Sequence, residues 1–206
     1  MSQQNQIRVV LFDVGGVLVE LSGVPAMLEW MSNRVSRDEL LRMWLTSPVV
    51  RAFETGRATP EAFADQLIAE MELTVKREQL LQEFTRWPTG LFPGALDLVS
   101  RVPTRYARAT LSNSNALHWP RLMVAMQLGE AFDHHFASHL IGKIKPDEEA
   151  FHHVTEALDC RAEEILFVDD SHLNVEAAKR VGIKAVQARG VAEAEQVLLE
   201  NGVLMG

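Results

Sequence analysis

The sequence predicts an α/β fold: a Rossmann-like, three-layer core with a parallel sheet, and an all-helical cap inserted after the first strand. Two observations carry this prediction. Short β-branched apolar runs alternate with amphipathic helical stretches, which is typical of a parallel sheet covered on both faces. Residues from about 22 to 90 interrupt this alternation and contain helix signals but no convincing strand. We therefore expect a discontinuous core at 1–20 plus 91–206 and a cap at 21–90.

The expected strands of the core are nearly continuous apolar runs, as in strands buried on both faces. They lie at 7–13, 106–112, 164–169 and 183–187, with a weaker run at 135–138. Between them we expect amphipathic helices at about 94–101, 119–128, 147–158, 174–181 and 191–200.

The cap segment carries clear helix starts. Ser36 and Glu39 have the spacing of a capping box, in which each side chain satisfies a free backbone amide. Thr59 precedes Pro60, which is a cap residue followed by proline at the first helical position. The large apolar residues of this segment are expected to form a small core, from which one tryptophan could still line a substrate pocket; the tryptophans are Trp30, Trp44 and Trp87.

Composition limits the classes of function. The chain has 206 residues and a formal net charge of −8, from 20 basic and 28 acidic residues. This balance argues against broad nucleic-acid binding, which needs a basic face, but it allows a phosphorylated small molecule as partner.

The single cysteine, Cys160, excludes an internal disulfide framework and fits a reducing compartment. Neither a secretory signal nor a membrane span is evident, so we expect a cytoplasmic protein without membrane contacts. The sequence does not indicate the oligomeric state.

Polar residues follow the predicted strands at the edge where ligands bind in open parallel sheets. Asp13 ends the first strand. Ser112 and Asn113 end the second, and Asp169 and Asp170 end another. Lys145 follows the weak strand, just before a proline that begins a helix. Several segments therefore direct polar groups to one edge of the sheet.

This set of side chains is complete for phosphoryl transfer. Asp13 and Asp170 supply the carboxylate oxygens that Mg²⁺ prefers. A lysine and a hydroxyl supply donors for phosphate oxygens, and an aspartate is a competent nucleophile toward phosphorus. The negative charge of the attacking aspartate would repel a phosphate unless a metal ion and a lysine offset the repulsion.

The motifs "FDVGGVL", "LSN", "KPDEEAF" and "FVDDSHLN" occur in this order over most of the chain. Together they resemble the four motifs of the haloacid dehalogenase superfamily, in the branch of phosphatases with a helical cap. "FETGRATPEAFADQLIAEM" and "LSNSN" are especially similar to the α-glucose-1-phosphate phosphatases of that branch, which also includes the phosphatase half of epoxide hydrolases. The resemblance implies a Mg²⁺-dependent phosphatase that acts on a small phosphorylated metabolite, with a sugar phosphate favoured.

The resemblance also implies a role for each matching residue. Asp13 would attack phosphorus and become an aspartyl-phosphate, and Lys145 and Ser112 would hold the phosphoryl group with the Asn113 amide nearby. Mg²⁺ would be held by Asp13, the carbonyl of Gly15 and Asp170. Two further residues are expected to support the site: Asp169, and Asn174, which could orient Lys145 or a metal-bound water.

Gly15 departs from the family pattern, because most of these phosphatases have an aspartate there that acts as acid and then as base. Such help is worth ~10²–10⁴-fold in rate. An activated leaving group would need it least, and the glucose-1-phosphate-type relatives also lack it. His118 is a candidate replacement for the acid. Arg57 is a second candidate site residue, because it could reach the leaving group, although a surface arginine is the simpler interpretation.

Other interpretations stay open. Asp13 could be a polar strand end, Ser112 a turn former, Lys145 a surface residue and the Asp169–Asp170 pair a helix cap. A 2-haloacid dehalogenase would use the same aspartate on carbon, but it needs no metal and lacks the late acidic pair. A catalytically weakened phosphate-binding module is the third possibility, since Gly15 replaces the usual acid. A phosphomutase fits less well, because mutases of the family rely on the missing acid.

Overall fold

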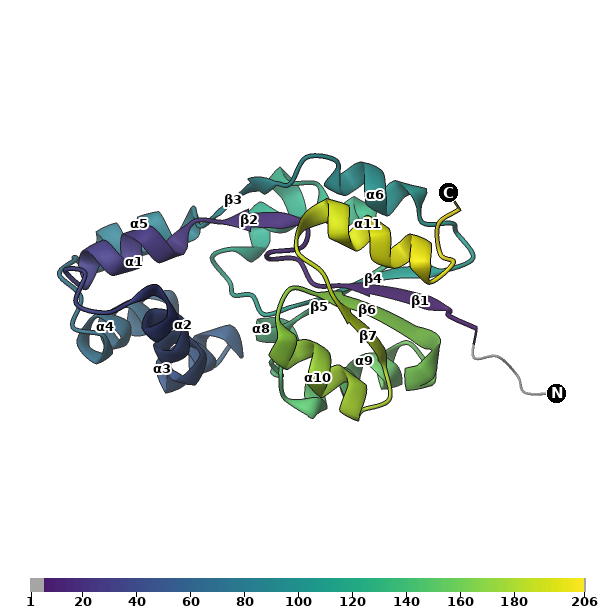
Figure 1. The fold of residues 1–206 in the computed structure, drawn as a ribbon. Coiled ribbons are helices and arrows are strands. Elements are labelled where there is room, and N and C mark those ends of the chain that lie inside the picture. Colours follow the sequence, from purple (N-terminus) through teal and green to yellow (C-terminus); the bar gives the residue numbers. More distant parts are fainter. Residues whose placement is uncertain (1–5, 206) are drawn as a thin grey trace.

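The core of the molecule is a five-stranded parallel sheet, in the order β5-β4-β1-β6-β7 (Figure 1). The computed structural model describes residues 6–205. The strands are β1 (Val9–Phe12), β4 (Ala107–Ser112), β5 (His134–Ala137), β6 (Ile165–Asp169) and β7 (Lys184–Gln187). The α/β fold class is confirmed, and each predicted strand is present within a few residues of its expected bounds.

Helices cover both faces of the sheet (Figure 1). Along β1, Val10 and Phe12 belong to one apolar cluster while Val9 and Leu11 belong to the other, as expected when successive side chains point to opposite faces. The first cluster includes side chains of α6 (Ala95–Arg101) and α11 (Gly190–Glu200). The second includes side chains of α9 (Glu148–Ala157) and α10 (His172–Arg180). The sheet therefore has the continuous burial that its apolar strands predict.

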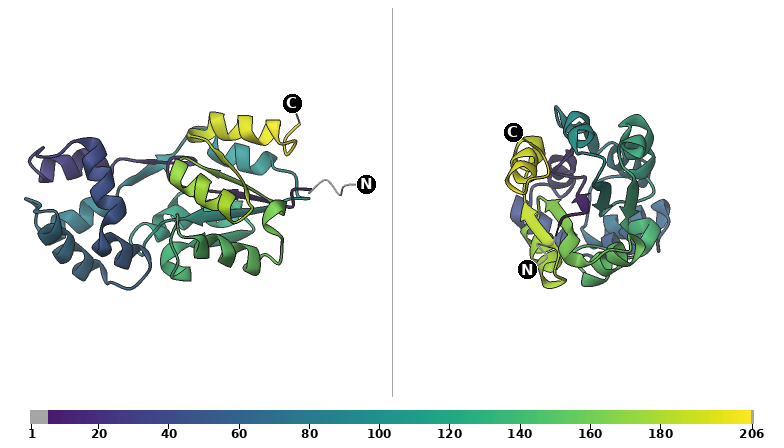
Figure 2. Two further views of the ribbon diagram at one scale, coloured as in Figure 1. Left: turned by 60° about the horizontal axis from the view of Figure 1, so that its bottom comes forward. Right: turned by 90° about the vertical axis from the view of Figure 1, so that its right-hand side faces the viewer.

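The segment after β1 forms a separate layer of helices beside the carboxyl edge of the sheet (Figures 1 and 2). It contains α1 (Gly23–Trp30), α2 (Arg37–Thr46), α3 (Pro48–Glu54), α4 (Pro60–Glu70) and α5 (Arg77–Thr85). We call the segment 22–87 the cap. Its apolar interior is centred on Phe53, Phe63 and Phe84, and the rings of Phe53 and Phe63 stack with centroids 4.2 Å apart.

Local signals explain where two of these helices begin. Ser36 Oγ accepts a hydrogen bond from the Glu39 N–H at 3.2 Å, and α2 begins at the next residue. Thr59 Oγ1 accepts from the Ala62 N–H at 3.2 Å, with Pro60 at the first position of α4. Each cap satisfies an amide that has no partner within its helix.

Two short strands that the sequence did not reveal connect the cap to the core. β2 (Val19–Leu21) pairs antiparallel with β3 (Pro88–Leu91). The expectation that residues 22–90 hold no strand is therefore wrong for residues 88–90, which belong to β3. The strand was missed because it begins with a proline and contains a glycine, and both residues rarely indicate a strand. Both connections between cap and core run through this two-stranded ribbon.

The cap also touches the core away from the ribbon. The Arg51 guanidinium on α3 forms an ion pair with the Asp147 carboxylate, at the start of α9. Gly56, in the turn after α3, packs so closely on the carbonyl of His139 that a side chain would not fit there. These contacts fix the C-terminal end of α3 against the core.

The region expected as one helix at 119–128 is irregular. A π-helical turn, η1 (Arg121–Ala125), is followed by α7 (Leu128–Ala131). Gln127 between them has a φ of +58°. Two further short elements are α8 (Ser138–Ile141) and the 3₁₀ turn η2 (Ala162–Glu164). Within residues 6–205, no helix has both the length and the apolar character needed to cross a membrane.

Candidate active site

Lys145 lies between two carboxylates at the carboxyl ends of β1 and β6. Its Nζ donates to Asp13 Oδ1 at 2.8 Å and to Asp169 Oδ2 at 2.7 Å. The side chain is buried, with 3% of the residue exposed, so it is not a surface lysine. Burial lowers the pKa of Lys145, but the charges of Asp13 and Asp169 outweigh this effect and leave it above its ordinary value. Lys145 is therefore a fixed cation at the sheet edge.

Asp169 is fully buried and is held from several sides. Asn174 Nδ2 donates to both of its carboxylate oxygens at 3.0 Å, and the Ser171 N–H donates to Oδ1 at 2.8 Å. Asn174 comes from the first turn of α10, so this helix start orients the carboxylate that in turn holds Lys145. Asn174 thus reaches Lys145 through Asp169 rather than by direct contact.

Asp13 follows β1, and its N–H donates to the Val168 carbonyl at 2.8 Å. This bond ties the end of β1 to β6. Burial raises the pKa of Asp13 to about 7; the charge of Lys145 opposes this shift, while Asp169 and Asp170 add to it. Three acidic groups around one lysine thus leave an excess of negative charge that a cation would relieve.

Three carboxylates could take part in holding that cation. Asp13, Asp169 and Asp170 each offer an oxygen within 4.8 Å of the others. Asp169 already accepts hydrogen bonds from Lys145, Asn174 and the Ser171 N–H. Asp13 accepts from Lys145 through Oδ1, so its Oδ2 is available to a cation. Burial and the charge of Asp169 raise the pKa of Asp170. An all-oxygen donor set of this kind suits Mg²⁺, so the residues present fit that ion.

Gly16 makes this arrangement sterically possible. Its φ is +76°, and a Cβ there would lie 2.5 Å from Asp170 Oδ2. The chain therefore passes over the Asp170 carboxylate at a distance that excludes any side chain. The neighbouring Gly15 is less constrained, because a Cβ there would meet only the flexible end of Leu21, at 2.9 Å.

Ser112 and Asn113 end β4 beside Asp13, but they are used differently. Ser112 is buried and borders the cavity described below. The Asn113 side chain is bound to the backbone of Lys145: Nδ2 donates to the Lys145 carbonyl at 2.9 Å, and Oδ1 accepts from the Lys145 N–H at 3.0 Å. The Asn113 side chain therefore positions Lys145 and is not available for a phosphate.

The geometry of His118 does not match its speculative role as the acid. Its Nε2 lies 2.7 Å from the Phe84 carbonyl, and its Nδ1 lies 3.1 Å from Asn115 Nδ2. The ring also stacks on Phe84, with centroids 4.4 Å apart. Burial lowers the pKa of His118 to about 4. A neutral imidazole with both nitrogens bonded inside the protein joins cap to core and has no proton to donate to a substrate.

Arg57 is not brought to the site. It is exposed in the turn after α3 and is not among the residues that line the cavity. The sequence analysis instead missed Glu54, which lies a few residues earlier at the end of α3 and lines that cavity. The available signal was helical spacing, because Glu54 stands one turn after the apolar Val50 and so shares its face of the helix.

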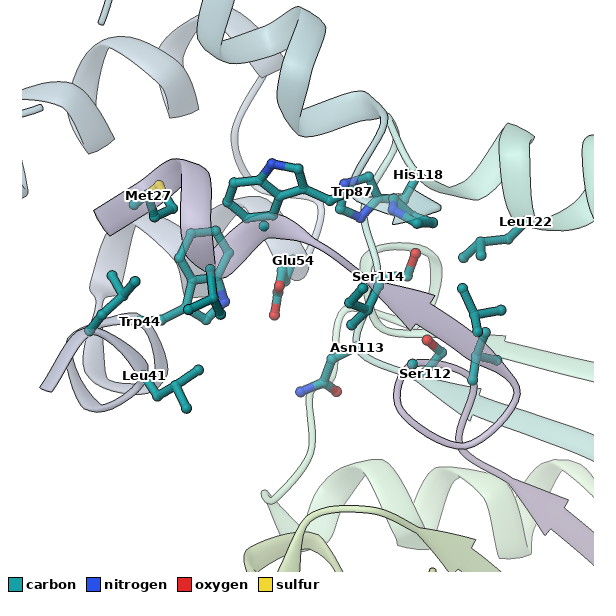
Figure 3. Close-up of a pocket in the computed structure, with 18 residues that line it drawn as sticks. Met27, Leu41, Trp44, Glu54, Trp87, Ser112, Asn113, Ser114, His118 and Leu122 are labelled. Atoms are coloured by element: carbon teal, nitrogen blue, oxygen red, sulfur yellow. The ribbon is translucent and has the colours of Figure 1, made fainter. Parts of the chain in front are cut away.

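A cavity of about 260 Å³ lies between the cap and the core (Figure 3). On the core side it is bordered by Gly15, Ser112 and Asn113, which adjoin the cluster of Asp13 and Lys145. On the cap side Figure 3 shows Met27, Leu41 and Trp44 around it, and the Glu54 carboxyl points into the space between cap and core. The carboxylate–lysine cluster therefore has an adjoining space for the rest of a substrate.

Known proteins are similar to this chain in sequence and in fold. A sesquiterpene phosphatase (astK) of Aspergillus oryzae is 29% identical over 179 residues, which cover 85% of this chain and 87% of that protein. A D-ribitol-5-phosphate phosphatase of Bacteroides thetaiotaomicron is 25% identical over 201 residues, covering 93% and 97%. A solved structure of a HAD family enzyme from the same bacterium, in complex with magnesium and inorganic phosphate, has a TM-score of 0.71 at 25% identity and covers 89% of this chain and 94% of that one.

The family model for haloacid dehalogenase-like hydrolases matches residues 7–182. This match spans the whole of the sheet edge described above, from Asp13 through Lys145 to Asp170. The chain therefore belongs to the haloacid dehalogenase-like hydrolase family.

Proposed function

We propose that the protein is a Mg²⁺-dependent phosphatase that hydrolyses a phosphomonoester through an aspartyl-phosphate on Asp13. The observation that carries this proposal is the buried Lys145, which is ion-paired with Asp13 beside the carboxylate of Asp170. The names of the relatives support it, because one is a sesquiterpene phosphatase and another a D-ribitol-5-phosphate phosphatase.

The proposed reaction has two steps. In the first, a carboxylate oxygen of Asp13 forms a bond to phosphorus while the bond from phosphorus to the organic oxygen breaks. In the second, water attacks phosphorus, the Asp13 carboxylate is released, and inorganic phosphate leaves. Lys145 and the Ser112 hydroxyl hold the phosphoryl oxygens and offset their charge in both steps.

The Asp13 carboxylate, the Gly15 carbonyl and the Asp170 carboxylate are the proposed ligands of Mg²⁺. When bound, this ion reduces the repulsion between the Asp13 carboxylate and the phosphate group. The solved relative that contains both magnesium and inorganic phosphate supports this assignment. Asp169 and Asn174 have a positioning role, because they fix Lys145 without facing the cavity.

The relatives do not indicate one substrate. D-ribitol 5-phosphate carries several hydroxyl groups, whereas a sesquiterpene phosphate is almost entirely hydrocarbon. The sequence favours a sugar phosphate through its resemblance to glucose-1-phosphate phosphatases. The residues that line the cavity are therefore the better guide to the substrate.

The direct test is phosphate release from p-nitrophenyl phosphate, with Mg²⁺ and with excess EDTA. We expect turnover that depends on the metal and that Asp13→Asn abolishes, with Asp97→Asn on the surface as control. Metal-dependent turnover by a folded Asp13→Asn variant would reject the covalent mechanism. Chloride release from 2-chloropropionate in EDTA would favour the dehalogenase instead, and phosphate binding without any hydrolysis would favour the binding module.

A further inference from the structure

The cavity between cap and core is lined mainly by hydrocarbon. Its apolar side chains include Val24, Met27, Leu40, Leu41, Trp44 and Trp87 from the cap. Outside the cap, the apolar lining consists of Val14, Val19, Leu21, Pro88 and Leu122. Leu21 and Leu41 border the cavity while keeping 60% and 39% of their surface exposed. Large apolar side chains exposed together beside a cavity are typical of a binding site for an apolar group.

The polar groups of the lining are few, and most are already bonded within the protein. The Asn113 side chain is bound to the backbone of Lys145, and both ring nitrogens of His118 are bonded. The proposed mechanism uses Ser112 for the phosphate. Among the described residues, two buried polar atoms of the lining have no hydrogen-bond partner, Trp87 Nε1 and Ser114 Oγ, and Glu54 offers a carboxyl. The lining can therefore satisfy two or three polar atoms of a ligand.

A sugar does not suit such a lining. Each hydroxyl that moves from water into an apolar space without a partner costs about 1–3 kcal/mol in proteins. A hydrocarbon group gains free energy from the same transfer, at about 0.8 kcal/mol per methylene. The free energy of transfer from water into this cavity is therefore unfavourable for a sugar and favourable for a hydrocarbon group. The cavity favours a substrate with a hydrocarbon group.

Because the cavity borders Gly15 and Ser112, a phosphate held beside Asp13 would place its organic group there. We propose, on the basis of the proposed function, that the substrate is a phosphomonoester of a predominantly apolar alcohol, whose carbon skeleton fills the cavity between α1, α2 and the sheet edge. Ser114 Oγ is the position for one oxygen on that skeleton. The proposal replaces the sugar phosphate favoured by the sequence.

The first experiment measures binding without turnover. A series of n-alkylphosphonates, from methyl to octyl, is titrated into the wild-type protein with Mg²⁺ by calorimetry. We expect the Kd to fall about fourfold per added methylene until the cavity is full. A Kd that stays constant or rises with chain length would overturn the apolar-substrate proposal, whether or not the protein turns anything over.

The second experiment compares two substrates with the same number of carbons. We expect kcat/KM for n-hexyl phosphate to exceed that for α-glucose 1-phosphate at least tenfold, although the sugar has the better leaving group. The reverse order would reject the proposed substrate class. If neither these esters nor p-nitrophenyl phosphate is hydrolysed while the alkylphosphonates bind with the expected slope, the proposed function fails and the apolar site remains.

A matched pair of variants connects the effect to the cavity. Leu41 and Leu45 lie one turn apart on α2, but only Leu41 lines the cavity, while Leu45 is 65% exposed and outside it. Leu41→Gln should reduce the gain in affinity per methylene, and Leu45→Gln should leave it unchanged. An equal effect of both substitutions would contradict binding in this cavity.

Glu54 carries a second and independent inference. The contacts on either side in the chain, Arg51 with Asp147 and Gly56 with His139, fix the end of α3 against the core. The Glu54 carboxyl points into the cavity that Gly15 and Ser112 also border (Figure 3). It therefore lies on the side of the phosphate site where the organic oxygen of the substrate would be.

We propose that Glu54 is the general acid and base that compensates for the missing aspartate at Gly15. In the first step the Glu54 carboxyl gives its proton to the departing organic oxygen, which leaves as an alcohol. In the second step the Glu54 carboxylate takes a proton from the water that attacks the aspartyl-phosphate, so the carboxyl is restored. The net reaction consumes one ester and one water and yields one alcohol and one phosphate.

The protonation state of Glu54 supports this role. Burial raises its pKa to about 7, and the Trp44 indole and the charge of Lys145 offset only part of the shift. A carboxyl with a pKa near neutrality holds its proton in part of the population and releases it in the rest, which an acid and base must do in one cycle.

The test uses Glu54→Gln with two kinds of ester. For n-hexyl phosphate we expect kcat to fall ~10²–10⁴-fold, because the alkoxide leaves poorly without a proton. For p-nitrophenyl phosphate, whose leaving group needs no acid, we expect a rapid stoichiometric burst of p-nitrophenol followed by slow turnover, because only the second step lacks its base. Glu61→Gln on the exposed side of α4 is the control and should behave as wild type.

A purely structural role for Glu54 predicts a different result. Both esters would then lose activity by the same factor, without a burst, and the melting temperature of the variant would fall. That pattern, or wild-type turnover of n-hexyl phosphate by Glu54→Gln, would overturn the assignment.

Discussion

Lys145 and Asp13 form a buried ion pair across 132 positions of the chain, with Nζ 2.8 Å from Oδ1. The same Nζ contacts Asp169 at 2.7 Å, so one cation is shared between two buried carboxylates. Neither carboxylate has another lysine or arginine as an ion-pair partner among the described residues. The stability of the site and its proposed chemistry therefore depend on the same ammonium group.

Removal of this ammonium should destabilise the fold as well as stop the reaction. Lys145→Met leaves two buried carboxylates without their cation, which typically costs about 3–5 kcal/mol. Urea unfolding at pH 7 measures the loss, and phosphate release should fall below detection. Lys143→Met is the control, because Lys143 forms no ion pair within residues 6–205. Equal unfolding midpoints for the two variants would contradict the buried pair.

Substitution of Gly16 should weaken binding of Mg²⁺. Gly16→Ala places a methyl group against the Asp170 carboxylate in a backbone conformation with positive φ. Gly142→Ala meets the same backbone strain, since its φ is +69°, but has no atom within 4 Å of the new methyl. The positive φ should cost each variant about 1–2 kcal/mol of stability, and the contact with Asp170 should add to this loss in Gly16→Ala. Only Gly16→Ala should need roughly 10–100-fold more Mg²⁺ for half-maximal activity; a similar metal requirement in both would argue against Asp170 as a ligand.

Asn174 should contribute to rate by orienting Asp169. Asn174→Ala removes the group that donates hydrogen bonds to both carboxylate oxygens of Asp169. These buried oxygens then lack part of their hydrogen bonding. Lost interactions of this kind are worth about 1–3 kcal/mol, so kcat should fall roughly 5–100-fold. Steady-state kinetics at saturating Mg²⁺ measures this. Asn201→Ala, at the C-terminal end of α11, is the matched control and should retain wild-type kcat.

Acid should destabilise the protein through His118. Its pKa is lowered by burial from 6.5 to about 4, so the unfolded chain binds a proton between these values and the folded chain does not. The contribution of the neutral His118 to the free energy of unfolding is therefore complete above pH 6.5 and is lost as the pH falls toward 4. At pH 5 the free energy of unfolding is lower by about 2 kcal/mol. The pH dependence of urea unfolding should be weaker in His118→Asn by this amount.

Much of the core followed from the sequence because its signals are local. The β-branched runs predict the buried strands directly. Asp13, Ser112 and Asp169 follow those strands, so the topology of a parallel sheet brings them to one edge. Lys145 was expected at the same edge because it follows the weak strand at 135–138, and the resemblance of the motifs to a known superfamily then gave it its role.

The cap shows where such reasoning stops. The pairing of β2 with β3 depends on residues about 70 positions apart, and Pro88 and Gly90 carry no strand propensity. The contact of His118 with Phe84 depends on how cap and core pack, and so does the position of the half-buried Glu54 at the cavity. No residue spacing encodes that packing, which is why the proposed acid was sought at His118 rather than at Glu54.

The ribbon of β2 and β3 has a consequence for how this enzyme can diversify. The groups proposed to bind phosphate lie at the edge of the sheet. Several side chains around the organic group, among them Leu41 and Trp44, lie instead on helices of the cap, which one pair of strands joins to the core. Substitutions such as those at Leu41 can therefore alter which alcohol is accepted without changing the residues proposed to bind phosphate. Trp44 is an exception, because it contacts the Glu54 carboxyl that we propose as the acid. Selection can therefore change the cap freely only at positions that contact the carbon skeleton alone.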